Sequence, residues 1–193
     1  MAKAKPVTGL NCQEATGKNA RLIAMLRLEE MYQWTKYVDH PYDVAGLHNL
    51  RIAAKRVRYT LEVFEDALPE ACKPIVDELA QLQDELGAVH DSDVMIALLR
   101  LCLASQDSGT AYEHALSRVE KHPGKGKLMV PPELLAKLLD PATVPSDEAR
   151  FGLEQLLQQR LQRREDEYKS FHQHWEHLQE RDFRRKVLET LNA

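Results

Sequence analysis

Apolar residues recur at intervals of three and four along most of this chain, and no stretch alternates with a period of two. Helix-forming residues dominate, whereas aromatic and β-branched residues are sparse. The pattern predicts an all-α fold, an antiparallel bundle of about five long helices joined by short loops. The expected helices run from about Thr16 to Val38, Val44 to Ala67, Cys72 to Leu86, Asp91 to Ala104, and Ser146 to His177 or beyond.

Capping residues suggest where several of these helices begin and end. Gly87 suits the left-handed position after a helix C-terminus, so the third helix is expected to stop there. Asp91 is a good N-cap for the fourth helix, with Asp93 in the first turn, where negative charge favours the helix dipole. Ser146, followed by Asp and Glu, should cap the last helix in a similar way.

Proline and glycine concentrate between residues 122 and 146, which predicts a flexible segment after a further turn or two at Thr110–Glu120. The segment contains a PGKGK loop at Pro123–Lys127 and one short apolar stretch, PELLAKLLD. The loop lacks the strand and terminal Ser or Thr of a P-loop, so we interpret it as a mobile basic loop that supplements binding. We expect residues 1–13 to form a flexible tail and residues 14–193 a single helical domain.

The stretch LHNLRIAAKRVRY, residues 47–59, carries a row of basic or titratable side chains. At about 100° per residue, their spacing places them within roughly a quarter of a helical wheel. The opposite side of the same helix is apolar. We call the row formed by His48, Arg51, Lys55 and Arg58 the basic ridge.

The charge around the ridge is uneven. The chain has a net charge of −4, so it lacks the overall basic character of a general nucleic-acid binder. Residues 1–60 hold ten Lys or Arg against five Asp or Glu, whereas residues 61–100 hold two against ten, and this acidic surround weakens indiscriminate binding to duplexes. Basic helical faces are most often solvated and paired with acids. No acid occurs between Val44 and Thr60, however, so we expect the ridge to lack intrahelical partners and to bind a polyanion.

Cysteine content and hydropathy indicate a cytoplasmic protein. The three cysteines, Cys12, Cys72 and Cys102, exclude a complete disulfide framework and give no paired zinc spacing. No apolar run approaches the length of a membrane span, and the polar start lacks the apolar segment of a secretory signal. We therefore expect no membrane partner, no metal and no cofactor.

Two ordered motifs, LHNLRIAAKRVRYTLEVF and LAQLQDELGAVHDSDVMIALL, closely resemble the CHAD family, the conserved-histidine α-helical domain. The matching elements are the basic ridge with Tyr59 after it and the Leu-Gly-x-x-x-Asp-x-Asp-Val run at residues 86–94. The resemblance implies a CHAD-like helical fold and non-catalytic binding of inorganic polyphosphate, with targeting to polyphosphate granules as one expected role. Family members usually contain two related halves around a basic cavity. This chain shows one motif, so we expect either a compact short version or a homodimer that completes the cavity.

Polyphosphate is a flexible chain of negative charges, so its recognition needs several donors along a groove. Arg51 and Arg58 would each bond two phosphate oxygens, and Lys55 would supply a compact point charge. His48 would donate a hydrogen bond and gain charge as the pH falls, so affinity should rise with acidity. Tyr59 would add a phenolic donor.

Four further basic residues are candidates by their placement. In the last helix, Arg160 and Arg164 fall inside an apolar stripe, where an unpaired charge is costly. Their partner is either the ligand or an acid of the acidic segment, unless their stems snorkel to solvent. Lys18 and Arg21 of the first helix could line the same groove.

Two other classes of function stay open at this point. Asp91 and Asp93 suggest an enzyme acting on phosphoanhydrides, although capping explains Asp91, and Asp93 could hold an arginine of the basic helix. Alternatively, the ridge docks an acidic protein or a nucleic acid, the latter not expected as the main ligand. We interpret His172, His174 and His177 as surface histidines, because no cysteine or acidic constellation completes a metal site with them.

Overall fold

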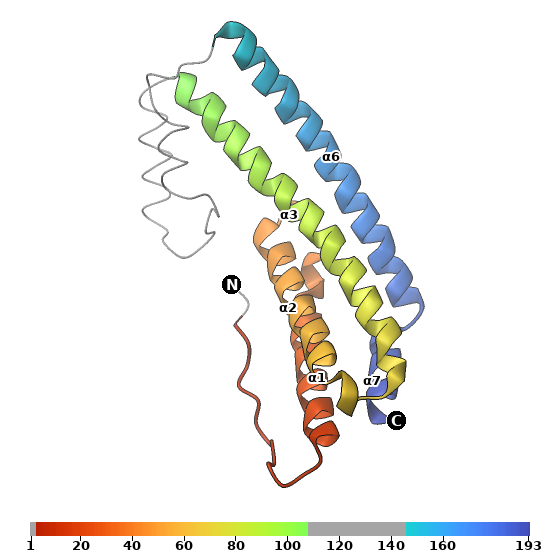
Figure 1. Cartoon of the computed structure of the whole chain (residues 1–193). Helices are drawn as coiled ribbons and strands as arrows, with labels where there is room; N and C mark the ends of the chain where they lie inside the picture. Colours follow the sequence, from red (N-terminus) through yellow and green to blue (C-terminus); the bar gives the residue numbers. More distant parts are fainter. Residues whose placement is uncertain (1–2, 108–145) are drawn as a thin grey trace. The chain divides into compact units, whose positions relative to one another are not determined.

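The computed structural model describes residues 3–107 and 146–193, which form helices and turns without any strand (Figure 1). The all-α prediction is therefore confirmed. Among the described helices, none combines the length and the apolar character that crossing a membrane requires. The turns expected at Thr110–Glu120, the PGKGK loop and the PELLAKLLD stretch lie outside the described residues. The helices are α1 (Thr16–Tyr32), α2 (Val44–Val63), α3 (Lys73–Asp107), α6 (Asp147–Glu180) and α7 (Phe183–Asn192), with 3-10 turns at Thr35–Tyr37, Glu65–Ala67 and Glu70–Cys72.

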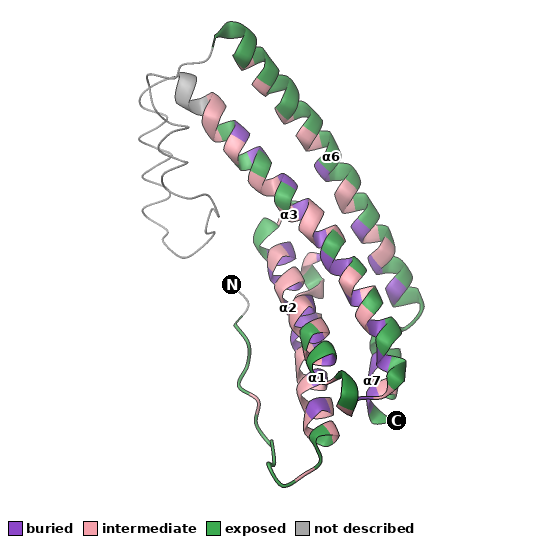
Figure 2. Ribbon diagram, viewed as in Figure 1, coloured by how far each residue is buried: buried purple, intermediate pink, exposed green. Residues whose placement is uncertain are grey.

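The chain divides into two compact units, to both of which α3 and α6 contribute. One unit holds Met1–Ala88 and Glu167–Ala193, and the other holds Val89–Asp166. In the first unit, α1 and α2 pack together, and apolar side chains from all five helices are buried (Figure 2). They recur at the three- and four-residue spacing expected of helices. Members of this core include Ala24, Leu28, Met31, Leu50, Ala54, Val57, Leu61, Ile75, Leu79, Leu82, Phe171, Trp175, Leu178, Val187 and Leu191.

The connection from α1 to α2 fixes the position of the basic helix. The Thr35 hydroxyl donates to the Tyr32 carbonyl at 2.9 Å, and α1 ends at Tyr32 instead of running to Val38 as expected. The carboxylate of Asp43 caps α2 by accepting a bond from the Gly46 N–H at 2.8 Å. A Cβ at Gly46 would lie 2.5 Å from the ring carbon Cγ of Tyr37, so glycine is required where α2 passes this ring.

The sequence predicted two helices separated at Gly87, and this prediction is wrong because one helix, α3, takes their place. The helix is continuous from Lys73 to Asp107, and Gly87 lies in its interior with a helical backbone. Among the described residues, the glycine with a positive φ is Gly9, so Gly87 does not end the helix, and Asp91 does not cap a new one. An interior glycine costs roughly 0.8–1 kcal/mol relative to alanine. Burial of Leu86 and Val89 on either side of Gly87 offsets this cost.

The last helix begins as its sequence predicts. The Ala149 N–H donates to the Ser146 hydroxyl at 3.3 Å, which confirms the cap, and α6 continues to Glu180. Asp182 then adopts a left-handed backbone with φ of 51°, and the chain turns into α7, a helix that the sequence pattern did not predict. In the first unit, the Tyr168 hydroxyl of α6 donates to the Val38 carbonyl at 2.6 Å and ties the two segments together.

Candidate functional site

The basic ridge lies along one side of α2, as the helical wheel predicts. Its four side chains are all half-buried, whereas Leu47, Leu50, Ala54, Val57 and Leu61 on the other side are buried in the core. Half-burial orders the stems of the cations and leaves part of each side chain accessible. The ridge is therefore a partly ordered row of cations on a helix anchored by its apolar face.

Arg51 joins the two sequence motifs in space. Its side chain passes α3 at Gly87, where a Cβ would lie 3.6 Å from the Arg51 Nε and 3.9 Å from its Nη2. The Nε is buried and makes no hydrogen bond to any described residue. A methyl group at position 87 would meet the guanidinium at ordinary contact distance, whereas a larger side chain would displace it. This contact brings the basic helix and the Leu-Gly run together in space.

Lys55 and Arg58 both approach the ring of Tyr59. The Lys55 ammonium lies 5.1 Å from the ring centroid, and the Arg58 guanidinium carbon lies 5.0 Å from it. Both distances fall in the range of cation–π attraction, and Tyr59 is itself 43% exposed. The ring and the two cations form one cluster at the C-terminal half of the ridge.

One ridge residue has an acidic partner within α2, contrary to expectation. The Arg58 Nε lies 3.2 Å from the Glu62 carboxylate, one turn along the helix and just beyond the acid-free stretch that ends at Thr60. Glu62 also lines a cavity of about 390 Å³ that carries the carboxylates of Glu65, Asp66, Glu70 and Asp77. The C-terminal end of the ridge therefore adjoins a mainly acidic region, which also contains Lys73.

Arg160 and Arg164, the two candidate arginines of α6, lie in the second unit, and Arg164 forms an ion pair with an acidic residue of the same unit. Its side chain is 5% exposed, and its Nε donates to the Asp93 carboxylate at 2.9 Å. Of the two partners considered for Arg164, the acid is the one that the structure provides. Asp93 thus pairs with an arginine of α6. Arg160 is half-buried on the same helix, and its role in a common groove with the ridge stays a prediction.

The α1 candidates differ from each other. Lys18 is 71% exposed and pairs with Glu14 at 2.6 Å. Arg21 is half-buried, and its Nε makes no hydrogen bond within the described regions of the chain. Burial raises the pKa of the Cys72 thiol, and the charge of Arg21 partly opposes this rise. The geometry therefore favours Arg21 over Lys18 as an ordered cation.

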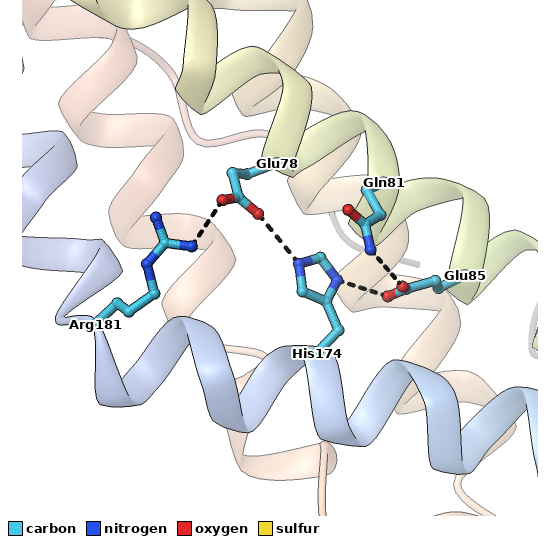
Figure 3. Close-up of polar contacts among 5 residues, drawn as sticks. All are labelled: Glu78, Gln81, Glu85, His174 and Arg181. Atoms are coloured by element: carbon cyan, nitrogen blue, oxygen red, sulfur yellow. Dashed lines mark hydrogen bonds and ion pairs between the residues drawn. The ribbon is translucent and has the colours of Figure 1, made fainter.

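The prediction of surface histidines is wrong for His174. Its side chain is only 10% exposed, with Nδ1 2.8 Å from the Glu85 carboxylate and Nε2 3.2 Å from that of Glu78 (Figure 3). Gln81 also donates to Glu85, and Arg181 lies 3.2 Å from Glu78. Each ring nitrogen of His174 therefore lies within hydrogen-bond distance of a carboxylate. His174 therefore connects α6 to α3 within the first unit.

The neighbouring histidines differ from His174. His177 is 60% exposed, as expected, whereas His172 is 26% exposed and lies 3.0 Å from Asp39. The signal for the buried contact lay in α3: Glu78 and Glu85 are seven residues apart and so share a face of the helix. Acids on a face that also carries buried leucines need a cationic partner.

The comparison with known families agrees with the two motifs. The family model of the CHAD domain matches residues 11–100, which span α1, α2 and the first three-quarters or so of α3. Residues 11–100 are a CHAD domain. The match contains the whole basic ridge and both Gly87 and Asp93, while α6 and α7 lie outside it. No curated protein and no solved structure matches the chain. The CHAD family is associated with proteins related to polyphosphate.

Proposed function

We propose that this CHAD domain binds inorganic polyphosphate through the basic ridge and does so without catalysing a reaction. The main support for the proposal is the position of Arg51 beside Gly87. There, a guanidinium of the basic ridge lies next to the Leu-Gly motif of α3. Lys55 and Arg58 continue the row along α2. Three cations along one helical face match the repeating negative charge of a phosphate chain.

The surrounding charge supports a flexible ligand over a long duplex. The acid-lined cavity beyond Arg58 repels phosphate at one end of the ridge, so a bound polyanion must leave in another direction. A flexible chain can turn away from these carboxylates, whereas a stiff duplex meets them along with the ridge. Inorganic polyphosphate therefore fits the ridge better than double-stranded DNA.

Titration with long-chain polyphosphate at two salt concentrations tests the proposal. We expect saturable binding that weakens with salt and is lost in a variant with Arg51, Lys55 and Arg58 changed to alanine. A matched control replaces Lys36, Arg185 and Lys186, three exposed cations outside the ridge, and loses the same charge. The control should bind like the parent. Equal binding by a folded ridge variant and the parent would refute the assignment.

Three further aspects of the proposal have separate readouts. Duplex DNA at equal phosphate concentration should displace little polyphosphate, whereas full displacement would favour a general polyanion module. Incubation with magnesium should release no orthophosphate. Imaging of a tagged chain tests recruitment to polyphosphate granules, and the mass in solution with and without polyphosphate tests the homodimer.

A further inference from the structure

The ring of Tyr59 contacts two cations of the basic ridge, a contact in which its hydroxyl takes no part. Two of the three permanently charged ridge side chains lie over this ring, Lys55 at 5.1 Å and Arg58 at 5.0 Å from its centroid. Both are long side chains on a helix surface, and such chains sample many rotamers when nothing holds them. An aromatic face within reach of both cations restricts this freedom.

Repulsion between the two cations makes this restriction more important. Lys55 and Arg58 are three residues apart on α2, so they are neighbours on one face and repel each other. Glu62 pairs with Arg58 but is 44% exposed, so solvent screens part of that attraction. The electron-rich face of Tyr59 attracts both cations without adding a formal charge that would repel phosphate.

We propose that Tyr59 is a positioning residue, whose ring holds Lys55 and Arg58 in place for a phosphate chain. The inference rests on the proposed function and concerns the same site. It assigns the role to the aromatic face, in place of the phenolic donor suggested by the sequence. The ordering of two flexible cations is completed before binding, so less conformational entropy is lost when the ligand arrives.

Two substitutions distinguish the role of the Tyr59 ring from that of its hydroxyl. Tyr59→Phe keeps the ring and removes the donor, and it should bind polyphosphate like the parent. Tyr59→Leu removes the ring, and it should weaken binding about three- to tenfold, because part of the ordering that the two cation–π contacts supply must then occur on binding. The slope of log affinity against log salt should stay the same, because the number of charges on the ridge is unchanged.

Two controls exclude a general effect on folding. Because Tyr59 is 43% exposed, Tyr59→Leu should unfold at nearly the parent's urea midpoint. Tyr42→Leu removes another tyrosine, 78% exposed in the loop before α2, and should leave the affinity unchanged.

The outcomes separate this inference from the proposed function. Binding by Tyr59→Leu as tight as the parent's would overturn the inference, and so would equal weakening in Tyr59→Phe, which would make the hydroxyl the active group. In both cases the proposed function stands, provided that the triple ridge variant loses binding. If the parent binds no better than the triple variant, the proposed function fails and the inference fails with it.

Discussion

Replacement of Gly87 with alanine should stabilise the chain by about 0.8–1 kcal/mol. Gly87 lies inside α3, where alanine is favoured over glycine by that amount. The new Cβ would lie 3.6 Å from the Arg51 Nε, an ordinary van der Waals distance, so no steric cost offsets the gain. If Gly87 instead ended a helix in the left-handed conformation, alanine would cost about 1 kcal/mol. The sign of the change therefore distinguishes the two structures.

Urea denaturation followed by helical circular dichroism measures this change. The matched control is Gly152→Ala in α6, where a Cβ meets no described atom within 4 Å and propensity alone acts. The two variants should gain similar stability. A further variant, Gly87→Leu, fills the seat of Arg51 and should weaken polyphosphate binding about tenfold while the chain stays helical.

Destabilisation of Gly87→Ala by about 1 kcal/mol or more, beside a stabilised Gly152→Ala, would refute the reasoning. That result would mean either that Gly87 has a backbone conformation unfavourable for alanine or that a neighbouring atom clashes with the methyl group. Unchanged binding by Gly87→Leu would show that the position of the Arg51 guanidinium on α3 does not matter for the ligand.

Three other changes have defined outcomes. Glu62→Gln removes the acid that pairs with Arg58, so polyphosphate affinity in a titration should rise about two- to fivefold, and a fall would contradict competition between the acid and phosphate. His174→Ala leaves two carboxylates of α3 without their shared partner and should lower the free energy of unfolding by about 1–3 kcal/mol; a loss below about 0.5 kcal/mol in urea would make the contact unimportant. In the folded chain, a thiol reagent at pH 8 should modify exposed Cys12 far faster than Cys72, which is buried and whose pKa burial raises; equal rates would contradict the packing.

Periodicity was sufficient to predict the helical class, the core-facing side of α2 and the common face of the ridge. These features depend on residues close together in the sequence, for which helical geometry fixes the directions of side chains. The cap at Ser146 was predictable for the same reason, since the hydroxyl and its N–H partner are three residues apart.

The errors concern contacts between distant segments. Gly87 is a residue typical of helix ends, yet α3 continues through it, with Leu86 and Val89 buried on either side and an arginine 36 positions earlier beside it. Asp93 was correctly expected to hold an arginine, but the partner is Arg164, 71 residues away. The interpretation of His174 failed because its two acids belong to another helix. The spacing of residues within one helix predicts which side chains share a face of that helix. It does not predict which other helix packs against that face, and these contacts depend on that packing.

The Asp93–Arg164 pair selects one sliding register between α3 and α6 in the second unit. Leucines at positions 153, 157 and 161 recur at nearly one helical turn, so a shift of α6 by about 5.4 Å would exchange one leucine for the next. The same shift would separate the Asp93 carboxylate from the Arg164 guanidinium, whose side chains are 12% and 5% exposed, at a cost of about 3–5 kcal/mol. Asp93 and Arg164 therefore fix the position of α6 along α3 in this unit, and a charge reversal at both positions should preserve that position.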